Sequence, residues 1–238
     1  MTQNSARKFD ADRAGEYASQ SRIALAGYDA CHELSACMLS AALGDGKPAR
    51  VLVVGAGGTA GEIIAAARLE PAWSFVAVDP SPPMLELARA HLDAAGISDR
   101  VKTVLGTAED IDPTLSFDAA IMIGVLHHLS GNEAKQEILT QIAARLLPAA
   151  PVVIAGNYRP YASQPLLMDA WAARWRMNGA NPEEVQSKMN KILHGAEPPQ
   201  SEEAVFSLLE KAGFVQPLRF FASLFWGAWL ARRASTAI

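Results

Sequence analysis

A run of β-branched residues that breaks into glycines constrains this fold more than any other feature of the sequence. Val51–Val54 has the pattern of a short buried strand, and the turn Gly55–Gly58 follows it before a helical pattern begins. Glycines at such a turn let the backbone approach a ligand closely, and the next helix offers unpaired N–H donors. A second predicted strand, Phe75–Val78, ends at Asp79, whose carboxylate can accept both hydroxyls of a ribose. The pattern therefore predicts a site for a nucleoside-containing cofactor.

The remaining sequence alternates between predicted strands and predicted helices. Continuous apolar strands separated by amphipathic helices indicate an α/β fold with a Rossmann-like parallel sheet, covered by helices on both faces. The predicted strands are Val51–Val54, Phe75–Val78, Val101–Leu105, Phe117–Gly124, Pro151–Ala155, Val215–Phe220 and Leu224–Leu230. The predicted helices are Asp10–Leu43, Glu62–Arg68, Met84–Ala95, Glu133–Leu147 and Ser201–Ala212. The last two strands are close enough in sequence to pair as an antiparallel hairpin.

Two parts of the chain depart from this alternation. Residues 1–48 are predicted to form an N-terminal helical cap, and residues 49–238 to form the cofactor-binding domain. From about residue 158 to residue 200 the alternation gives way to aromatic-rich helix, which predicts a lid insertion before the hairpin. Because the carboxyl ends of parallel strands meet at one edge of the sheet, we expect the lid to cover a crevice there.

The composition narrows the class of protein. Half of the residues are hydrophobic and 19% are charged, which is typical of a globular protein with a full core. A net charge of -4 without a block of lysines or arginines predicts no nucleic-acid partner. No apolar run is long enough to span a bilayer, and the N-terminus lacks an apolar signal core, so we expect a cytoplasmic protein without membrane contact. Cys31 and Cys37 match no metal or redox spacing and are expected to be buried thiols, and no metal site is predicted.

The identity of the nucleoside cofactor depends on three later segments. The spacing Gly55-x-Gly57-x-x-Ala60 also fits a dinucleotide fingerprint, so a NAD-dependent oxidoreductase is one alternative. However, the loop Asp79–Leu85 turns directly into a helix, Gly106–Ile111 follows the third strand, and Phe117–Leu129 leads from the fourth strand to the rim. This ordered set resembles the class I S-adenosylmethionine (SAM)-dependent methyltransferases. The resemblance implies SAM as the cofactor and the antiparallel C-terminal hairpin of that superfamily.

Segments at both ends resemble the carboxy-SAM synthases more closely. They are Ala26-Gly27-Tyr28, Asn178–Met189 and Glu210–Phe214, and the likeness extends from Gly27 to Leu230. It implies that Tyr28 binds the methionine carboxylate, that Gly55 lies beside the amino-acid part and that Asp79 binds the ribose. It also implies a homodimer formed through residues 171–194.

Three departures from that family weigh against carboxy-SAM synthesis. Met189 stands where the synthases carry an arginine that holds the extra carboxylate, and a methionine side chain cannot do this. Thr107 replaces an acidic residue on the adenine side, and Ile123 replaces an asparagine at the end of the fourth strand. The pocket near the sulfonium is therefore expected to be more apolar than in the synthases.

The candidate site residues follow from these motifs. The predicted cofactor-binding residues are Tyr28, Gly55, Ala56, Gly57, Asp79, Pro80, Met84, Thr107, Ala108, Glu109 and Ile123. The catalytic candidates are Tyr28, His127, His128 and Asn157, because either imidazole can accept a proton and the amide can orient an acceptor. The predicted substrate-pocket residues, mostly aromatic faces that can stabilise a cationic sulfonium, are Tyr158, Trp171, Trp175, Met189 and Trp226.

These residues are compatible with more than one reaction. The favoured hypothesis is transfer of the SAM methyl group to a small, fairly apolar metabolite. In the alternative, SAM is the only substrate: its α-amine attacks its own γ-carbon, expels methylthioadenosine and closes azetidine-2-carboxylate, as in small SAM-cyclising enzymes of this fold. A non-catalytic SAM-binding regulator is a third hypothesis.

Overall fold

One mixed sheet organises the molecule. The computed structural model describes residues 11–235, with side chains from residue 16 onward. Within that range the sheet has seven strands in the order β3-β2-β1-β4-β5-β7-β6. The strands are β1 (Ala49–Val54), β2 (Trp73–Asp79), β3 (Val101–Leu105), β4 (Ala119–Ile123), β5 (Pro151–Asn157), β6 (Phe214–Ser223) and β7 (Trp226–Arg233). β1 to β5 pair in parallel, and β7 pairs antiparallel with both β5 and β6. The predicted α/β sheet with its terminal hairpin is confirmed.

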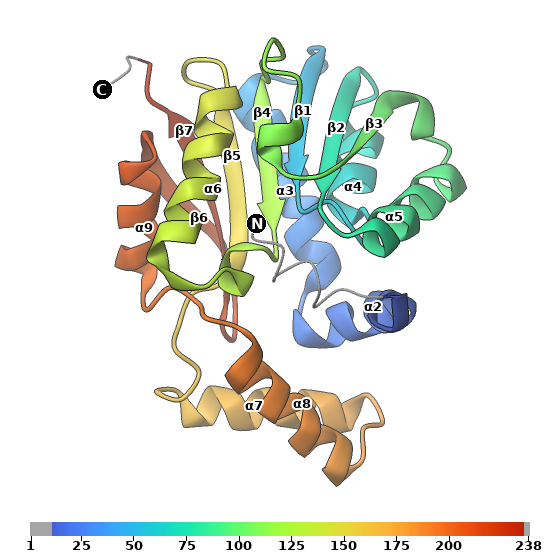
Figure 1. Ribbon diagram of the computed structural model, residues 1–238, viewed down its shortest axis with the longest axis vertical. Helices are drawn as coiled ribbons and strands as arrows, with labels where there is room; N and C mark the ends of the chain where they lie inside the picture. Colours follow the sequence, from blue (N-terminus) through green and yellow to red (C-terminus); the bar gives the residue numbers. More distant parts are fainter. Residues whose placement is uncertain (1–10, 236–238) are drawn as a thin grey trace.

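Helices cover both faces of the sheet (Figure 1). The helices are α2 (Ala11–Ala24), α3 (Tyr28–Leu43), α4 (Gly61–Leu69), α5 (Pro82–Ala94), α6 (Gly131–Arg145), α7 (Pro165–Met177), α8 (Pro182–Gly195) and α9 (Glu202–Lys211). Leu39 of α3 and Ile63 of α4 pack with Val53 on one face. Leu139 of α6 packs with Leu52 on the other, so β1 is buried from both sides. This double burial explains why its sequence is continuously apolar rather than alternating.

The lid, which we define as α7 and α8, extends beyond one edge of the sheet together with α2 (Figure 1). Trp171 Nε1 donates to the carbonyl of Ala24 at 2.9 Å, and Arg174 Nε donates to the carbonyl of Ile23 at 2.8 Å. These donors satisfy carbonyls at the end of α2 that have no partner within that helix. The lid is therefore hydrogen-bonded to the C-terminal end of α2. None of the helices in residues 11–235 is long and apolar enough to span a membrane.

Several predicted boundaries differ from the structure for local reasons. The single helix predicted over Asp10–Leu43 is two helices, because Gly27 adopts φ +85° and breaks the path between them. β4 starts at Ala119 because Phe117 forms an isolated bridge with Leu146 instead. β7 starts at Trp226 because Leu224, at φ +50°, lies in the hairpin turn.

The prediction that both cysteines are buried is wrong for one of them. Cys31 is buried and Cys37 is exposed. Six residues correspond to about 240° around an α-helix of 3.6 residues per turn, so the two side chains cannot share one face. The buried thiol of Cys31 has its pKa raised to about 12, chiefly by desolvation.

Candidate cofactor and acceptor site

The glycine turn after β1 is tied to the neighbouring strand. The N–H groups of Gly55 and Ala56 both donate to the carbonyl of Val78, at 2.9 and 3.2 Å. Gly57 must lack a side chain, because a Cβ there would lie 2.6 Å from Asp79 Oδ2 and 2.6 Å from Met84 Cβ. The turn therefore packs closely against the last residue of β2 and the first turn of α5. A glycine turn also lets the backbone approach a ligand closely.

Two backbone donors fix the carboxylate of Asp79 at the end of β2. The Gly57 N–H donates to Oδ2 at 2.9 Å, and the Ser81 N–H donates to Oδ1 at 2.8 Å. Each oxygen retains a further lone pair, so the carboxylate can still accept the two ribose hydroxyls. Burial raises the pKa of Asp79 above its ordinary value, against the lowering effect of the two N–H donors. The geometry fits the predicted ribose-binding role.

A hollow of about 440 Å³ runs from this turn to the loop after β4. The predicted residues that line it are Gly55, Gly57, Asp79, Pro80, Met84, Ile123 and His128. A smaller hollow of about 200 Å³ shares Gly55 and Pro80 and reaches Thr107 and Ala108. The two hollows adjoin at Gly55 and Pro80, beside the carboxylate predicted to bind a ribose.

Three predicted cofactor residues line neither hollow. Ala56 is fully buried in the core beneath the turn. Glu109 faces α6, where its Oε1 accepts from Gln141 Nε2 at 2.8 Å. Tyr28 lies at the start of α3. Their assignment to the cofactor stays a prediction.

Tyr28 belongs to a buried polar cluster beside the glycine turn. Its hydroxyl is hydrogen-bonded to Thr59 Oγ1, and the guanidinium of Arg22 lies 4.8 Å from its ring centre. Burial, followed by the nearby carboxylate of Glu62, raises the pKa of Tyr28 to about 12. Burial lowers the pKa of His32 in the same cluster, but Glu62 outweighs it and the net shift is upward. A phenol with such a pKa stays protonated at neutral pH, so it can donate to a carboxylate but cannot act as a base.

The two adjacent histidines after β4 have different surroundings. His127 is buried, and the backbone N–H of Asn157 donates to its Nδ1 at 3.3 Å. This bond occupies the lone pair of that nitrogen, so the neutral ring carries its proton on Nε2. His128 is half-buried and lines the larger hollow. Of the two, His128 is the one placed to meet an acceptor.

Asn157 and Trp226 lie at the same edge, on adjacent strands. They are direct cross-strand partners of β5 and β7. The ring of Trp226 contacts His127 edge to face, with 5.2 Å between ring centres, and reaches within 3.6 Å of a Cβ built on Gly124. Since Gly124 lines the larger hollow, Trp226 lies close to a residue of that hollow, but neither Trp226 nor Asn157 lines it.

None of the five predicted substrate-pocket residues, Trp226 included, lines either hollow. Trp171, Trp175 and Met189 form the apolar interior of the lid together with Phe225. Tyr158 packs on the opposite face of the sheet, where its ring meets Trp229 at 5.1 Å between centres. These aromatic side chains are therefore packing residues in this conformation.

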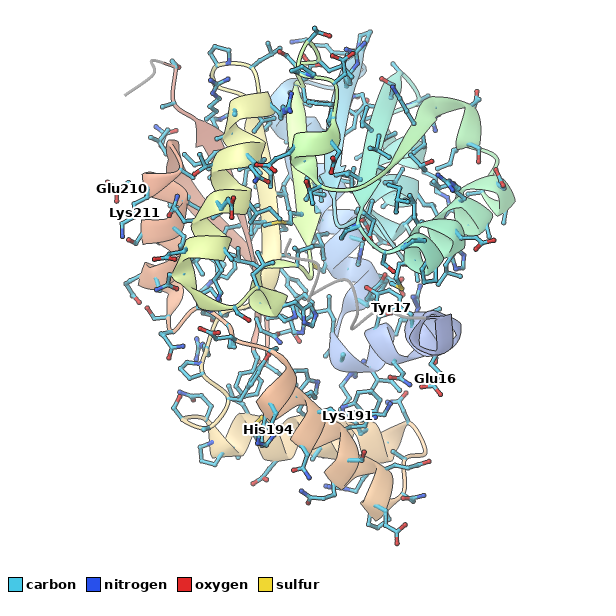
Figure 2. All side chains as sticks on the ribbon, viewed as in Figure 1. Glu16, Tyr17, Lys191, His194, Glu210 and Lys211 are labelled. Atoms are coloured by element: carbon cyan, nitrogen blue, oxygen red, sulfur yellow. The ribbon has the colours of Figure 1, made fainter. Side chains whose placement is uncertain are left out.

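Sequence reasoning missed Tyr17, which lines the larger hollow from α2. Figure 2 shows Tyr17 on the side of α2 that faces the sheet and Glu16 on the other side. Its ring covers the turn at Gly58, where a Cβ would lie 2.3 Å from Tyr17 Cε1. The available signal was only an aromatic residue in a helical cap, and the fold of the cap decides which turn it covers.

Comparison with known proteins agrees with this site. Residues 52–152 match the family model of a methyltransferase domain. A carboxy-S-adenosyl-L-methionine synthase from Aeromonas salmonicida is 27% identical over 171 residues, which are 71% of this chain and 68% of that protein. A catechol O-methyltransferase from Mycobacterium tuberculosis is 31% identical over 124 residues, 51% of this chain and 52% of that protein. An O-methyltransferase family 2 protein from Planctomyces limnophilus, solved with apigenin, superposes with a TM-score of 0.65 at 16% identity, covering 98% of this chain and 62% of its own.

Residues 52–152 therefore match a methyltransferase domain, the chain is similar to class I SAM-dependent methyltransferases, and SAM is its cofactor. Within that superfamily it is similar to the carboxy-SAM synthase-like branch. The cofactor that the glycine turn and Asp79 indicate is thereby identified. Among the described residues, no three His, Cys, Asp or Glu side chains gather as metal ligands do.

We expect Asp79→Asn to weaken SAM binding. An amide presents one acceptor oxygen instead of two and places its own N–H against a backbone N–H donor. We expect this change to cost about 1.5–3 kcal/mol of binding free energy, which raises the Kd for SAM about 10- to 100-fold. Isothermal titration calorimetry with SAM measures this. The matched control is Asp118→Asn, whose carboxylate accepts from Arg50 N at the opposite edge of the sheet. An unchanged Kd in the Asp79 variant removes the ribose assignment.

We also expect Tyr17→Ala to speed the release of SAM. Loss of the ring that covers the turn removes about 1–2 kcal/mol of apolar contact, about 5- to 30-fold in affinity. Stopped-flow dissociation of SAM measures the rate. Ser19→Ala, on the exposed side of α2, is the control. A dissociation rate equal to that of the parent shows that Tyr17 does not contact the cofactor.

Proposed function

We propose that this protein transfers the methyl group of SAM to a small, fairly apolar acceptor molecule with an oxygen or nitrogen nucleophile. The observation that carries the proposal is the position of His128. Its imidazole lines the same hollow as Gly57 and Asp79, so a general base faces the space next to the cofactor site.

The residues present account for the steps that the protein must perform. SAM supplies an activated methyl group when it is bound, so the protein mainly has to align the acceptor and exclude water. Gly57 and Asp79 hold the cofactor side, and Ile123 and Val125 provide apolar walls towards the acceptor. His128 is placed to take the proton that the acceptor nucleophile loses.

Charge and similarity both support a small-molecule acceptor. The net charge of -4 disfavours a polyanionic acceptor such as nucleic acid. The relative from Mycobacterium tuberculosis is named for methyl transfer to catechol oxygen, and the Planctomyces limnophilus structure holds apigenin. Both names refer to small, mostly apolar molecules, which is the class we propose here.

Mass spectrometry of the purified protein tests the reaction type. The protein is incubated with SAM alone and then with SAM plus a small-metabolite extract. We expect S-adenosylhomocysteine only when the extract is present, together with a product heavier by one CH₂ that identifies the acceptor. Methylthioadenosine formed together with azetidine-2-carboxylate from SAM alone, faster than with boiled protein, would instead establish cyclisation and reject methyl transfer.

With the acceptor identified, we expect His128→Gln to lower kcat by about 10²- to 10⁴-fold, the usual contribution of a general base. The Kd for SAM should stay within about twofold, because the backbone N–H bonds to Asp79 are untouched. The control is His194→Gln on the exposed face of the lid (Figure 2). A kcat close to that of the parent contradicts the base assignment.

A further inference from the structure

We propose that Trp226 and Asn157 form a subsite that binds a neutral hydroxyl group of the acceptor. This inference rests on the proposed function, since it assigns the chemistry of the acceptor end of the same site. It is carried by two buried side chains, each with one polar atom that has no partner within residues 16–235.

Strand register brings the two side chains together. Asn157 of β5 lies directly opposite Trp226 of β7, so both side chains project from the same face of the sheet. Two residues before Asn157 on β5, Ala155 pairs with Ile123 of β4 on one side and with Ala228 of β7 on the other. Because side chains alternate along a strand, Ile123, Asn157 and Trp226 share that face. Ile123 lines the larger hollow, so the pair lies on the same face of the sheet as a residue of that hollow and two residues beyond its register, although neither Asn157 nor Trp226 itself lines the hollow.

The hydrogen bonding of the pair is incomplete. Asn157 is 4% exposed and Trp226 is 9% exposed. Asn157 Nδ2 donates to the hydroxyl of Tyr161 at 2.7 Å, which leaves Oδ1 as an acceptor without a described partner. The indole N–H of Trp226 is likewise a buried donor without one. A buried polar atom left unpaired costs about 1–3 kcal/mol, and a ligand with complementary atoms recovers that free energy.

The two atoms specify the chemistry of the ligand. An indole N–H only donates and an amide oxygen only accepts, whereas a hydroxyl can accept from the first and donate to the second. A carboxylate or phosphate would place negative charge against Asn157 Oδ1. Apolar side chains such as Leu25 and Ala155 pack around Trp226, whose ring also contacts the imidazole of His127, and Arg22 is paired with Asp29 at 2.6 Å. A neutral alcohol or phenol with an apolar body therefore fits best.

Binding of matched probes tests the subsite without requiring turnover. The 238-residue chain is saturated with S-adenosylhomocysteine and titrated with phenol, anisole, toluene or benzoate. The indole N–H signals are followed by ¹H–¹⁵N NMR, and Trp226→Phe identifies the Trp226 signal by its loss. We expect phenol to shift that signal downfield, anisole and toluene to bind more weakly, and benzoate not to bind.

Removal of one hydrogen bond should raise the Kd for phenol about 5- to 10-fold in Trp226→Phe. The matched control is Trp73→Phe, since the indole N–H of Trp73 donates to the carbonyl of Lys47 away from the site. We expect this control to leave the affinity for phenol unchanged.

Equal affinity for phenol and toluene, or an unchanged Kd in Trp226→Phe, overturns the subsite. Tighter binding of benzoate than of phenol overturns its neutrality. If Trp226→Phe does not fold, the subsite is tested by the Kd for phenol in Asn157→Leu and by the indole N–H shift that phenol causes in the parent protein. Failure of the subsite can be distinguished from failure of the proposed methyl transfer, because phenol can shift the Trp226 signal even in a protein that proves to cyclise SAM.

Discussion

The hydrogen bond from Gly57 N–H to the Asp79 carboxylate is the interaction on which the site depends. It joins the turn after β1 to the end of β2, and the Ser81 N–H holds the other carboxylate oxygen. The contact is possible only because residue 57 lacks a Cβ. Desolvation opposes this ionised group, as its raised pKa shows, so the two donors and a polar ligand must compensate for burial. A buried carboxylate with accepting capacity left over is suited to a ligand with adjacent hydroxyls.

The second constraint is the path from the lid to the cofactor site through α2. Trp171 and Arg174 bind the last carbonyls of α2, and Lys188 of α8 lies 4.0 Å from Glu16. One residue further along, Tyr17 covers the glycine turn. These contacts form one continuous path from the lid through α2 to the residue that covers the glycine turn.

Local sequence pattern was sufficient to predict the sheet and its cofactor edge. Val51–Val54, the glycine turn and Asp79 could be placed because strand, turn and carboxylate are neighbours in sequence or in one βαβ unit. The roles of the aromatic residues were not predictable in this way. Trp171, Trp175 and Tyr158 have the composition of a sulfonium pocket, but packing of distant elements places them in the lid interior or the opposite core. Likewise, burial and a hydrogen bond from the backbone N–H of Asn157, 30 residues away, distinguish His127 from His128.

Charge at the acceptor end explains how this chain can resemble a carboxy-SAM synthase and still be proposed to act differently. A bound carboxylate needs an oppositely charged, multidentate partner in a buried site. Met189, the residue that the resemblance aligns with that partner, lies inside the lid among apolar side chains such as Val185 and Phe225. Ile123, which lines the hollow, shares its face of the sheet with Asn157 and Trp226, and all three side chains are uncharged. A neutral wall next to a cationic sulfonium favours an uncharged acceptor, because a second ion would be desolvated there without a partner of its own.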